Sequence, residues 1–332
     1  MREKLAPYGE SRCTLADVNF AMLSKTDNPS PSSKSIPSKW LAILAVTSAV
    51  LVYFLIIFGS HVRVTDSGMG CPDWPLCKGS ITPIHGFHAF MEQTHRYIAG
   101  LVSILVIATA FFAARKRTQP AAIRPAVFSV GIVAVQVVLG AITVFDGNGA
   151  PTVAAHLLAG LALLGGATIT ALATLVPKRP TMGTRLGSLG WIAITSAGLL
   201  YLSGSLVVNA EAEKACASFP LCPSNQPMHL VILHILHRSV ALIASIALVS
   251  LAAHAWKSWS GFRGARALAL TLVGLIAATA TLGIFGALLK APAHLQDLHL
   301  AAAAAVLVTS VALASLGWLS AADSKEAISV QR

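Results

Sequence analysis

Charged residues are scarce in this chain, and their scarcity excludes most soluble proteins. They make up 11% of the 332 residues, whereas hydrophobic residues make up 55%. A soluble domain usually carries about 25% charged residues. Acidic residues are the scarcer kind, with 13 Asp and Glu against 24 Lys and Arg. The basic residues are spread over alternate loops and form no single patch, so the positive charge does not indicate nucleic-acid binding.

Two further signals are missing from the sequence. The N-terminus lacks the early apolar core of a cleavable signal peptide. Residues 1–39 are polar and rich in Ser and Pro, so we expect a disordered cytoplasmic tail there, and residues 320–332 are expected to form a second cytoplasmic tail. Alternating apolar segments of about 10 residues, the mark of a membrane β-barrel, do not occur.

Long apolar stretches fill the region between the tails. Each has about the 20 residues that a helix needs to cross a bilayer. We therefore predict an all-α integral membrane protein with eight transmembrane helices. Lys and Arg gather in the loops after the second, fourth and sixth helices, which predicts that both termini are cytoplasmic. The predicted helices are residues 40–59, 92–114, 125–145, 152–176, 189–208, 229–256, 267–289 and 297–319.

Sequence landmarks from the first half of the chain recur in the second half. They keep the same order, and corresponding residues are 142 to 145 positions apart. Because each half holds four helices, both halves enter the membrane in the same direction, as in a parallel repeat. We predict two four-helix bundles, residues 40–176 and 189–319. The landmarks are Cys71 and Cys77 with Cys216 and Cys222, His95 with His237, Gly140 with Gly283, and His156 with His299.

Four histidines lie inside predicted helices, where ionisable side chains are costly and usually functional. His95 and His156 lie about one turn below the outer helix ends, and His237 and His299 repeat this placement. Two imidazoles at similar depth in one bundle are suited to binding a haem iron from both sides. The alternative is a core histidine bonded to a neighbouring backbone. Zinc fits less well, because the cysteines lie outside the membrane and the histidines within it.

Charged residues next to these histidines are further candidates. Arg96 and Arg238 are candidate contacts for haem propionates, or interfacial arginines that reach the lipid headgroups. Glu92 shares a helix face with His95, and the corresponding residue of the second half is His234. A carboxylate beside a haem is able to take a proton or to stabilise positive charge. The alternative is a glutamate favoured by the helix dipole.

The two loop cysteine pairs are suited to an oxidising compartment. In each pair, Cys71/Cys77 and Cys216/Cys222, the cysteines are six residues apart with a proline between them. We predict a disulfide that stiffens a loop over the haem pocket. A redox-active dithiol is the alternative, and the lack of a Cys-x-x-Cys motif favours the structural interpretation.

At these residues the chain resembles a known family, the haem A synthases. The resemblance extends from about Trp40 to about Leu319. Not all members of that family carry both cysteine pairs, which supports a structural disulfide. The motifs that carry the resemblance are Arg63-Val-Thr-Asp-Ser-Gly, Cys71-Pro-Asp-Trp-Pro-Leu-Cys77, Glu92-x-x-His95-Arg96, Gly140-Ala-x-Thr-Val, His156-Leu-Leu-Ala-Gly, and His237-Arg238 with His299.

The resemblance implies an oxidoreductase that converts haem O to haem A by oxidising a ring methyl group to a formyl group. It implies a haem b cofactor at His237 and His299, the substrate haem at His95 and His156, and an essential acid at Glu92. The implied setting is the cell inner (cytoplasmic) membrane, with membrane lipid around the protein. The implied partners are haem O synthase, terminal oxidase assembly factors and an unidentified redox partner.

Three rival functions fit parts of the same pattern. A di-haem b-type electron-transfer protein needs two equivalent sites, which the difference between Glu92 and His234 argues against. A haem O or haem A carrier that assists oxidase assembly would bind haem without converting it. A transporter would be indicated by a clearly broken helix or by a charge at the membrane midplane, and the sequence shows neither.

Overall fold

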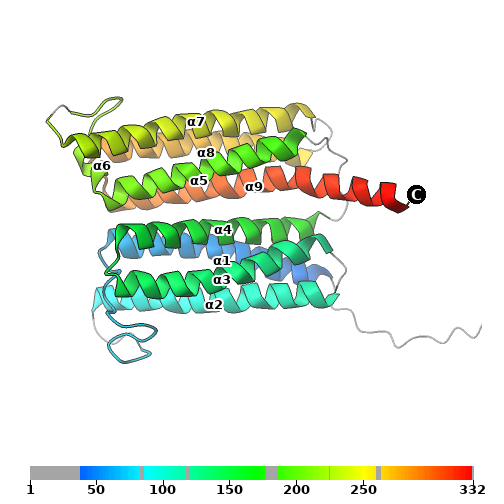
Figure 1. Ribbon diagram of the computed structural model, residues 1–332, viewed down its shortest axis with the longest axis horizontal. Helices are drawn as coiled ribbons and strands as arrows, with labels where there is room; N and C mark the ends of the chain where they lie inside the picture. Colours follow the sequence, from blue (N-terminus) through cyan, green and yellow to red (C-terminus); the bar gives the residue numbers. More distant parts are fainter. Residues whose placement is uncertain are drawn as a thin grey trace, which may run out of the picture. The chain divides into compact units, whose positions relative to one another are not determined.

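The computed structural model describes residues 38–82, 86–116, 120–176, 185–223, 225–258 and 263–330. Long helices dominate these ranges (Figure 1). A short helix, α6 (Ala212–Ala215), lies in one of the loops. The long helices are α1 (Ser38–Val64), α2 (Phe87–Lys116), α3 (Pro120–Phe145), α4 (Ala150–Leu175), α5 (Arg185–Asn209), α7 (Met228–Ser258), α8 (Arg263–Leu288) and α9 (Ala293–Val330).

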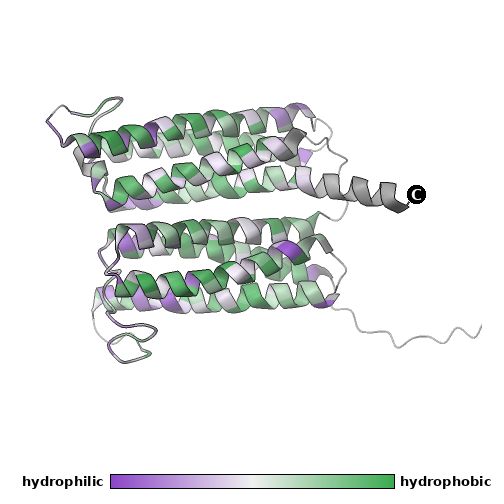
Figure 2. Ribbon diagram, viewed as in Figure 1, coloured by the Kyte–Doolittle hydropathy of each residue, from purple (hydrophilic) through white to green (hydrophobic). Residues whose placement is uncertain are grey.

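Eight of these helices are long and apolar enough to cross a membrane, which confirms the predicted eight-helix membrane fold. A helix satisfies its own backbone hydrogen bonds, as the interior of a bilayer requires. Figure 2 shows hydrophobic residues along the helices and hydrophilic ones mostly towards their ends. Large apolar side chains such as Phe54, Ile104 and Ile243 are exposed on the outer surfaces. The protein is therefore a multi-pass membrane protein whose apolar side chains face lipid.

The helices extend beyond the predicted apolar stretches. α2 begins at Phe87, five residues before the predicted start, so Glu92 is not in its first turn and the helix-dipole interpretation of this residue is wrong. His95 lies about 12 Å from the start of α2, at 1.5 Å per residue, not one turn below it. α9 continues to Val330 through most of the predicted tail, where Ala, Lys and Glu favour helix. Residues 1–37 and 331–332 of the predicted tails lie outside the described residues.

The helices before and after residue 180 have the same neighbours. α1 and α3 each pack against both α2 and α4, and α5 and α8 each pack against both α7 and α9. We call these sets the N-terminal bundle (α1–α4) and the C-terminal bundle (α5, α7–α9). They meet where α9 packs against α1 and α4, and where α5 packs against α4. In Figure 1 the two cysteine loops lie at the same end of the helices, opposite the C-terminal end of α9.

Polar contacts join the two bundles near the cysteine loops. Asp297 of α9 accepts a hydrogen bond from Ser60 of α1 at 2.8 Å and pairs with His61 at 2.8 Å. Arg63 donates to the backbone oxygen of Val208 in α5 at 3.1 Å. These contacts fix the end of α1 nearest the cysteine loops against the C-terminal bundle.

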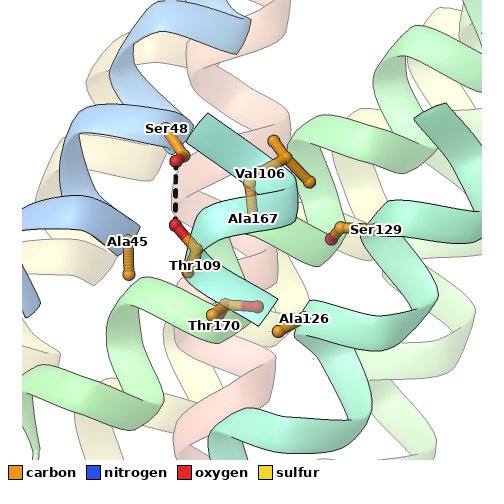
Figure 3. A pocket seen from close by; sticks show the side chains of 8 residues that line it. All are labelled: Ala45, Ser48, Val106, Thr109, Ala126, Ser129, Ala167 and Thr170. Atoms are coloured by element: carbon orange, nitrogen blue, oxygen red, sulfur yellow. Dashed lines mark hydrogen bonds between the residues drawn. The ribbon is translucent and has the colours of Figure 1, made fainter. Parts of the chain in front are cut away.

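The two bundles differ in the core at the opposite end of the helices. In the N-terminal bundle a cavity of about 10 Å³ is lined partly by hydroxyl groups (Figure 3). Ser48 and Thr109 hydrogen bond across it at 3.2 Å. At the same repeat offsets the C-terminal bundle has fully buried apolar side chains in one cluster. The hydroxyl residues Ser48, Thr109, Ser129 and Thr170 correspond to Ala193, Leu251, Leu272 and Leu313.

Candidate functional site

The four predicted ligand histidines form one pair in each bundle. His95 of α2 and His156 of α4 lie on helices that are diagonally opposed, since each packs on α1 and α3. His237 of α7 and His299 of α9 are placed in the same way about α5 and α8. In each pair the two imidazoles are near enough to interact electrostatically. The structure therefore brings together the residues that the sequence pairs.

Each histidine ring packs against a glycine of a neighbouring helix. A Cβ atom built on Gly59 of α1 would lie 2.9 Å from Cε1 of His95, and one on Gly204 of α5 would lie 3.2 Å from Cε1 of His237. Such distances leave no room for a larger residue. Gly283 is equally close to His299, at 3.0 Å.

The remaining ring, that of His156, lies against Gly140 of α3 in the same arrangement. The distance from a Cβ atom at Gly140 to Cε1 of His156 would be 3.5 Å, an ordinary van der Waals contact. All four rings thus face a glycine of the adjacent helix, and a Cβ atom would crowd three of them, those of His95, His237 and His299.

Hydrogen bonds fix the histidine tautomers in the C-terminal bundle. Nδ1 of His299 lies 3.0 Å from the backbone oxygen of Thr279, which only accepts, so Nδ1 carries the proton. Nδ1 of His237 lies 3.0 Å from Oγ of Ser203, whose own hydrogen is directed to the backbone oxygen of Leu200 at 2.9 Å. Both rings therefore present an unprotonated Nε2, which is the form that binds iron. This donor set fits a bis-histidine haem.

The N-terminal bundle lacks these bonds. Nδ1 of His95 and Nδ1 of His156 are buried and have no hydrogen-bond partner among the described residues. The aromatic ring of Phe58 lies beside His95, with the ring centres 6.1 Å apart. His95 and His156 are therefore placed like the pair in the C-terminal bundle, but no hydrogen bond among the described residues fixes the tautomer of either ring.

Glu92 and Arg96 connect α2 to the first cysteine loop. Glu92, 5% exposed, accepts a 2.6 Å hydrogen bond from Arg96 and a 2.8 Å bond from the backbone N–H of Cys71. The Arg96 guanidinium also donates to the backbone oxygens of Asp73, Leu76 and Cys71. Its two terminal nitrogens are thus occupied by the protein, and a propionate contact at Arg96 stays a prediction.

Among the described residues of the C-terminal bundle, Arg238 has no ion pair like that of Arg96 with Glu92. His234, at the position corresponding to Glu92, is 7% exposed and its Nδ1 has no partner among the described residues. Arg238 donates to the backbone oxygens of Cys216, Ser218 and Pro220 in the second cysteine loop. Both arginines therefore hold a cysteine loop, but only the first is neutralised by a carboxylate.

The two predicted disulfides are present, Cys71–Cys77 and Cys216–Cys222, with Cα atoms 4.6 Å and 4.8 Å apart. The carboxylate of Asp73, inside the first ring, accepts hydrogen bonds from the backbone N–H groups of Gly79 and Lys78, which follow the ring, and these bonds lower the pKa of Asp73. Among the described ranges no three His, Cys, Asp or Glu residues converge on one point. Each of these four cysteines is bonded to its partner in one of the two disulfides.

The sequence profile of the cytochrome oxidase assembly protein family (COX15-CtaA) matches residues 42–86 and 85–311. The chain belongs to this family. The match includes both histidine pairs, both cysteine rings and Glu92. Curated proteins that resemble the chain carry the name heme A synthase, so the family inferred from the sequence motifs is confirmed.

Three curated heme A synthases illustrate the similarity. That of Shewanella oneidensis is 27% identical over 328 residues, covering 84% of this chain and 96% of that protein. That of Bacillus licheniformis is 32% identical over 200 residues, covering 56% of this chain and 64% of that protein. That of Shouchella clausii is 32% identical over 220 residues, covering 61% of this chain and 72% of that protein. The match thus spans slightly less than two thirds of the Bacillus protein.

Some residues of the site were not recognised from the sequence. Gly59 and Gly204, which face His95 and His237, are 145 positions apart, the same offset as the cysteine rings. The repeat spacing alone would have identified them. Ser203 gives no such signal, because a buried serine in a transmembrane helix usually bonds to its own helix.

Proposed function

We propose that this protein is a haem A synthase, which oxidises a ring methyl group of haem O to a formyl group and supplies haem A to respiratory oxidases. One observation carries the proposal. Both histidine pairs face glycines of neighbouring helices, but Glu92, a buried carboxylate three residues before His95, corresponds to His234 in the C-terminal bundle. The heme A synthases among its relatives support the same activity.

The two pairs are assigned different haems. His237 and His299 bind a resident haem b through Nε2, because their Nδ1 atoms are held by the protein. His95 and His156 bind the substrate, haem O. A haem b held by His237 and His299 would supply electron transfer between the substrate site and an outside redox partner.

Glu92 is the candidate catalytic residue. Turning a methyl group into a formyl group with water as the oxygen source removes four electrons and four protons (CH3 + H2O → CHO + 4 H+ + 4 e−). The electrons pass to the redox partner, and a base near the methyl group is needed to take the protons. Glu92 lies three residues before His95 on the same face of α2, and its two hydrogen bonds hold it there. A carboxylate has about four lone-pair sites, so Glu92 retains capacity to accept a proton or to stabilise positive charge.

A different function is favoured by one observation. The nearly equal poses of His95 and His237 against their glycines suit two equivalent haems, as in a di-haem electron-transfer protein. A haem O or haem A carrier, acting with haem O synthase or oxidase assembly factors, would need the same two sites. Neither rival function gives a reason for a carboxylate at only one pair.

The test is to purify the protein from cells that supply haem O and to analyse the extracted haems by mass. The expected product is haem A. In Glu92→Gln, which keeps the size and the bond from Cys71, we expect bound haem O and a conversion rate at least about 100-fold lower. Asp66→Asn, which alters an exposed carboxylate nearby, is the matched control and should leave conversion unchanged. Unconverted haem O in the wild-type protein would show that the proposed activity is wrong.

The same proposal includes a location in the cell inner membrane with both termini in the cytoplasm. Lys and Arg residues at the helix ends opposite the cysteine loops support it. The disulfide rings and the histidine pairs then face the oxidising side. A green fluorescent protein fused after Arg332 should fluoresce, because this protein becomes fluorescent when it folds in the cytoplasm. A non-fluorescent fusion at normal expression would indicate the opposite orientation.

A further inference from the structure

The imidazoles of His95 and His237 are placed almost identically in the two bundles. Measured from a Cβ atom built on Gly59, the distances to Cε1, Nδ1 and Nε2 of His95 are 2.9, 3.6 and 3.6 Å. From Gly204 to the same atoms of His237 they are 3.2, 3.7 and 3.9 Å. The ring pose is therefore shared, and any difference between the sites must come from what surrounds the ring.

The residue before each glycine makes that difference. In α5 it is Ser203, whose Oγ accepts a 3.0 Å hydrogen bond from Nδ1 of His237. At the corresponding position of α1, 145 residues earlier, it is Phe58. The ring of Phe58 is tilted 32° from the imidazole of His95 and offers no acceptor. Nδ1 of His95 is accordingly buried without a partner among the described residues.

The second histidine of each pair shows the same contrast. Nδ1 of His299 donates to the backbone oxygen of Thr279 in α8 at 3.0 Å. Nδ1 of His156 is buried and has no partner in the described part of the chain. Both rings of the C-terminal bundle are thus held at Nδ1, and neither ring of the N-terminal bundle is held.

We propose that these Nδ1 hydrogen bonds make the C-terminal site a permanent haem site, and that their absence makes the N-terminal site an exchangeable one. Ser203 is a positioning residue for the resident haem, and Phe58 is its replacement at the site where haem enters and leaves. The inference rests on the proposed function only in that both pairs bind haem. It adds the residues that decide how long each haem stays.

The physical reason lies in the partner of the atom that does not bind the metal. A hydrogen bond at Nδ1 fixes the tautomer and the ring orientation, and it makes Nε2 a stronger donor to iron. Loss of such a partner typically lowers metal affinity by about 10- to 100-fold. A ring without the bond must adopt the right tautomer each time haem binds, and it gains less from binding.

The C-terminal site is tested in a full-length His95→Ala, His156→Ala background, so that only the resident haem is observed. We expect Ser203→Ala to release haem to excess apomyoglobin about 10- to 100-fold faster. We also expect the midpoint potential to rise, because a less basic imidazole stabilises ferric iron less. Ser203→Thr, which restores a hydroxyl, should recover both values.

Ser205→Ala is the matched control for this experiment. Ser205 is a buried serine of the same helix, and its Oγ accepts from Asn209, not from a histidine. We expect haem release and the midpoint potential to match the parent protein. Equal release from Ser203→Ala and Ser205→Ala, with the potential unchanged, would overturn the proposal.

The reciprocal exchange tests the N-terminal site in a His237→Ala, His299→Ala background. Phe58→Ser should hold haem about 10-fold longer than Phe58→Ala, which removes the ring without adding an acceptor. Equal retention in these two variants would contradict the role of position 58. If the wild-type protein binds haem at neither pair, the proposed function fails as well. If haem binds and only these comparisons fail, the proposed function stands without this inference.

Discussion

The N-terminal and C-terminal bundles are built alike but differ in what surrounds their histidines. Both have the same helix neighbours, a cysteine ring held by an arginine, and histidines that face glycines. The N-terminal bundle has Phe58 and Glu92 where the C-terminal bundle has Ser203 and His234. The comparison teaches that a repeated helix frame fixes the pose of the histidines, while the residues around each ring differ and, in our proposal, assign each site its function.

The cores at the other end of the bundles show the same divergence. Fully buried leucine and alanine side chains form the C-terminal core, whereas hydroxyl groups line a small cavity in the N-terminal core (Figure 3). Thr109 and Thr170 donate to backbone oxygens of their own helices, and Thr109 also hydrogen bonds to Ser48 of α1. The bundle assigned to the exchanging haem therefore also has the more polar core at this end.

Removing a ligand from each bundle is the change that should separate them most. We expect His237→Ala to lose the optical spectrum of the resident haem b, because the other axial ligand alone does not complete the site. His95→Ala should keep that spectrum and lose bound haem O. Difference spectra of the reduced, purified variants provide the measurement. A full haem b spectrum in His237→Ala would show that the two sites have been assigned the wrong way round.

Enlarging a glycine beside a histidine should have the next largest effect. Gly204→Val places a branched side chain where even a Cβ atom would be 3.2 Å from His237, so we expect haem b content to fall by at least about 10-fold. Haem content per protein, measured as the pyridine haemochrome, tests this. Gly198→Val in the same helix is the control, because no atom lies within 4 Å of a Cβ at that position. Equal haem contents in the two variants would mean that the glycine contact does not matter.

Truncating the two cores should affect stability unequally. Leu313→Ala removes a fully buried side chain, and we expect a loss of about 2–5 kcal/mol of unfolding free energy. Thr170→Ala at the corresponding position of the N-terminal bundle should lose about 1 kcal/mol, since its hydroxyl bonds only within α4. Denaturant unfolding in detergent measures both values. Similar losses would indicate that the small cavity does not reflect looser packing.

Acidification should affect the first cysteine ring more than the second, and this effect should be the smallest. The backbone N–H groups of Gly79 and Lys78 hold the pKa of Asp73 below its usual value of 3.8. The ionised form therefore stabilises the ring at neutral pH, and this contribution is lost as the pH falls from 3.8 through the lowered pKa. The second ring has Ser218 at the corresponding position.

Pepsin cleavage of the two loops between pH 2 and 5 measures that difference, with sites identified by mass. We expect cleavage of the first loop to increase at the acid end relative to the second. In Asp73→Asn this relative increase should vanish, because the amide does not titrate. If the pH profile of cleavage is unchanged in Asp73→Asn, a group other than Asp73 causes the acid-dependent increase.

Much of this architecture follows from the sequence. Hydropathy predicts the eight helices, because only a helix of about 20 apolar residues satisfies its backbone inside lipid. The repeat offset identifies both histidine pairs and both disulfides, since corresponding positions of a repeat occupy corresponding places. The helix ends were less predictable. α2 begins at Phe87 and α9 extends to Val330, because helix continues into polar residues that hydropathy does not mark.

The sequence by itself determined the class of fold, the family and the four histidines, all of which depend on local composition and spacing. Only the tertiary structure decided which atoms these histidines contact. Ser203 and Thr279 reach the Nδ1 atoms from neighbouring helices, and Arg96 reaches the loop carbonyls, through distances that packing sets. A serine and a phenylalanine one residue before a glycine look unremarkable in a membrane helix. They matter because the tertiary structure places the imidazole of His237 beside Ser203 and that of His95 beside Phe58.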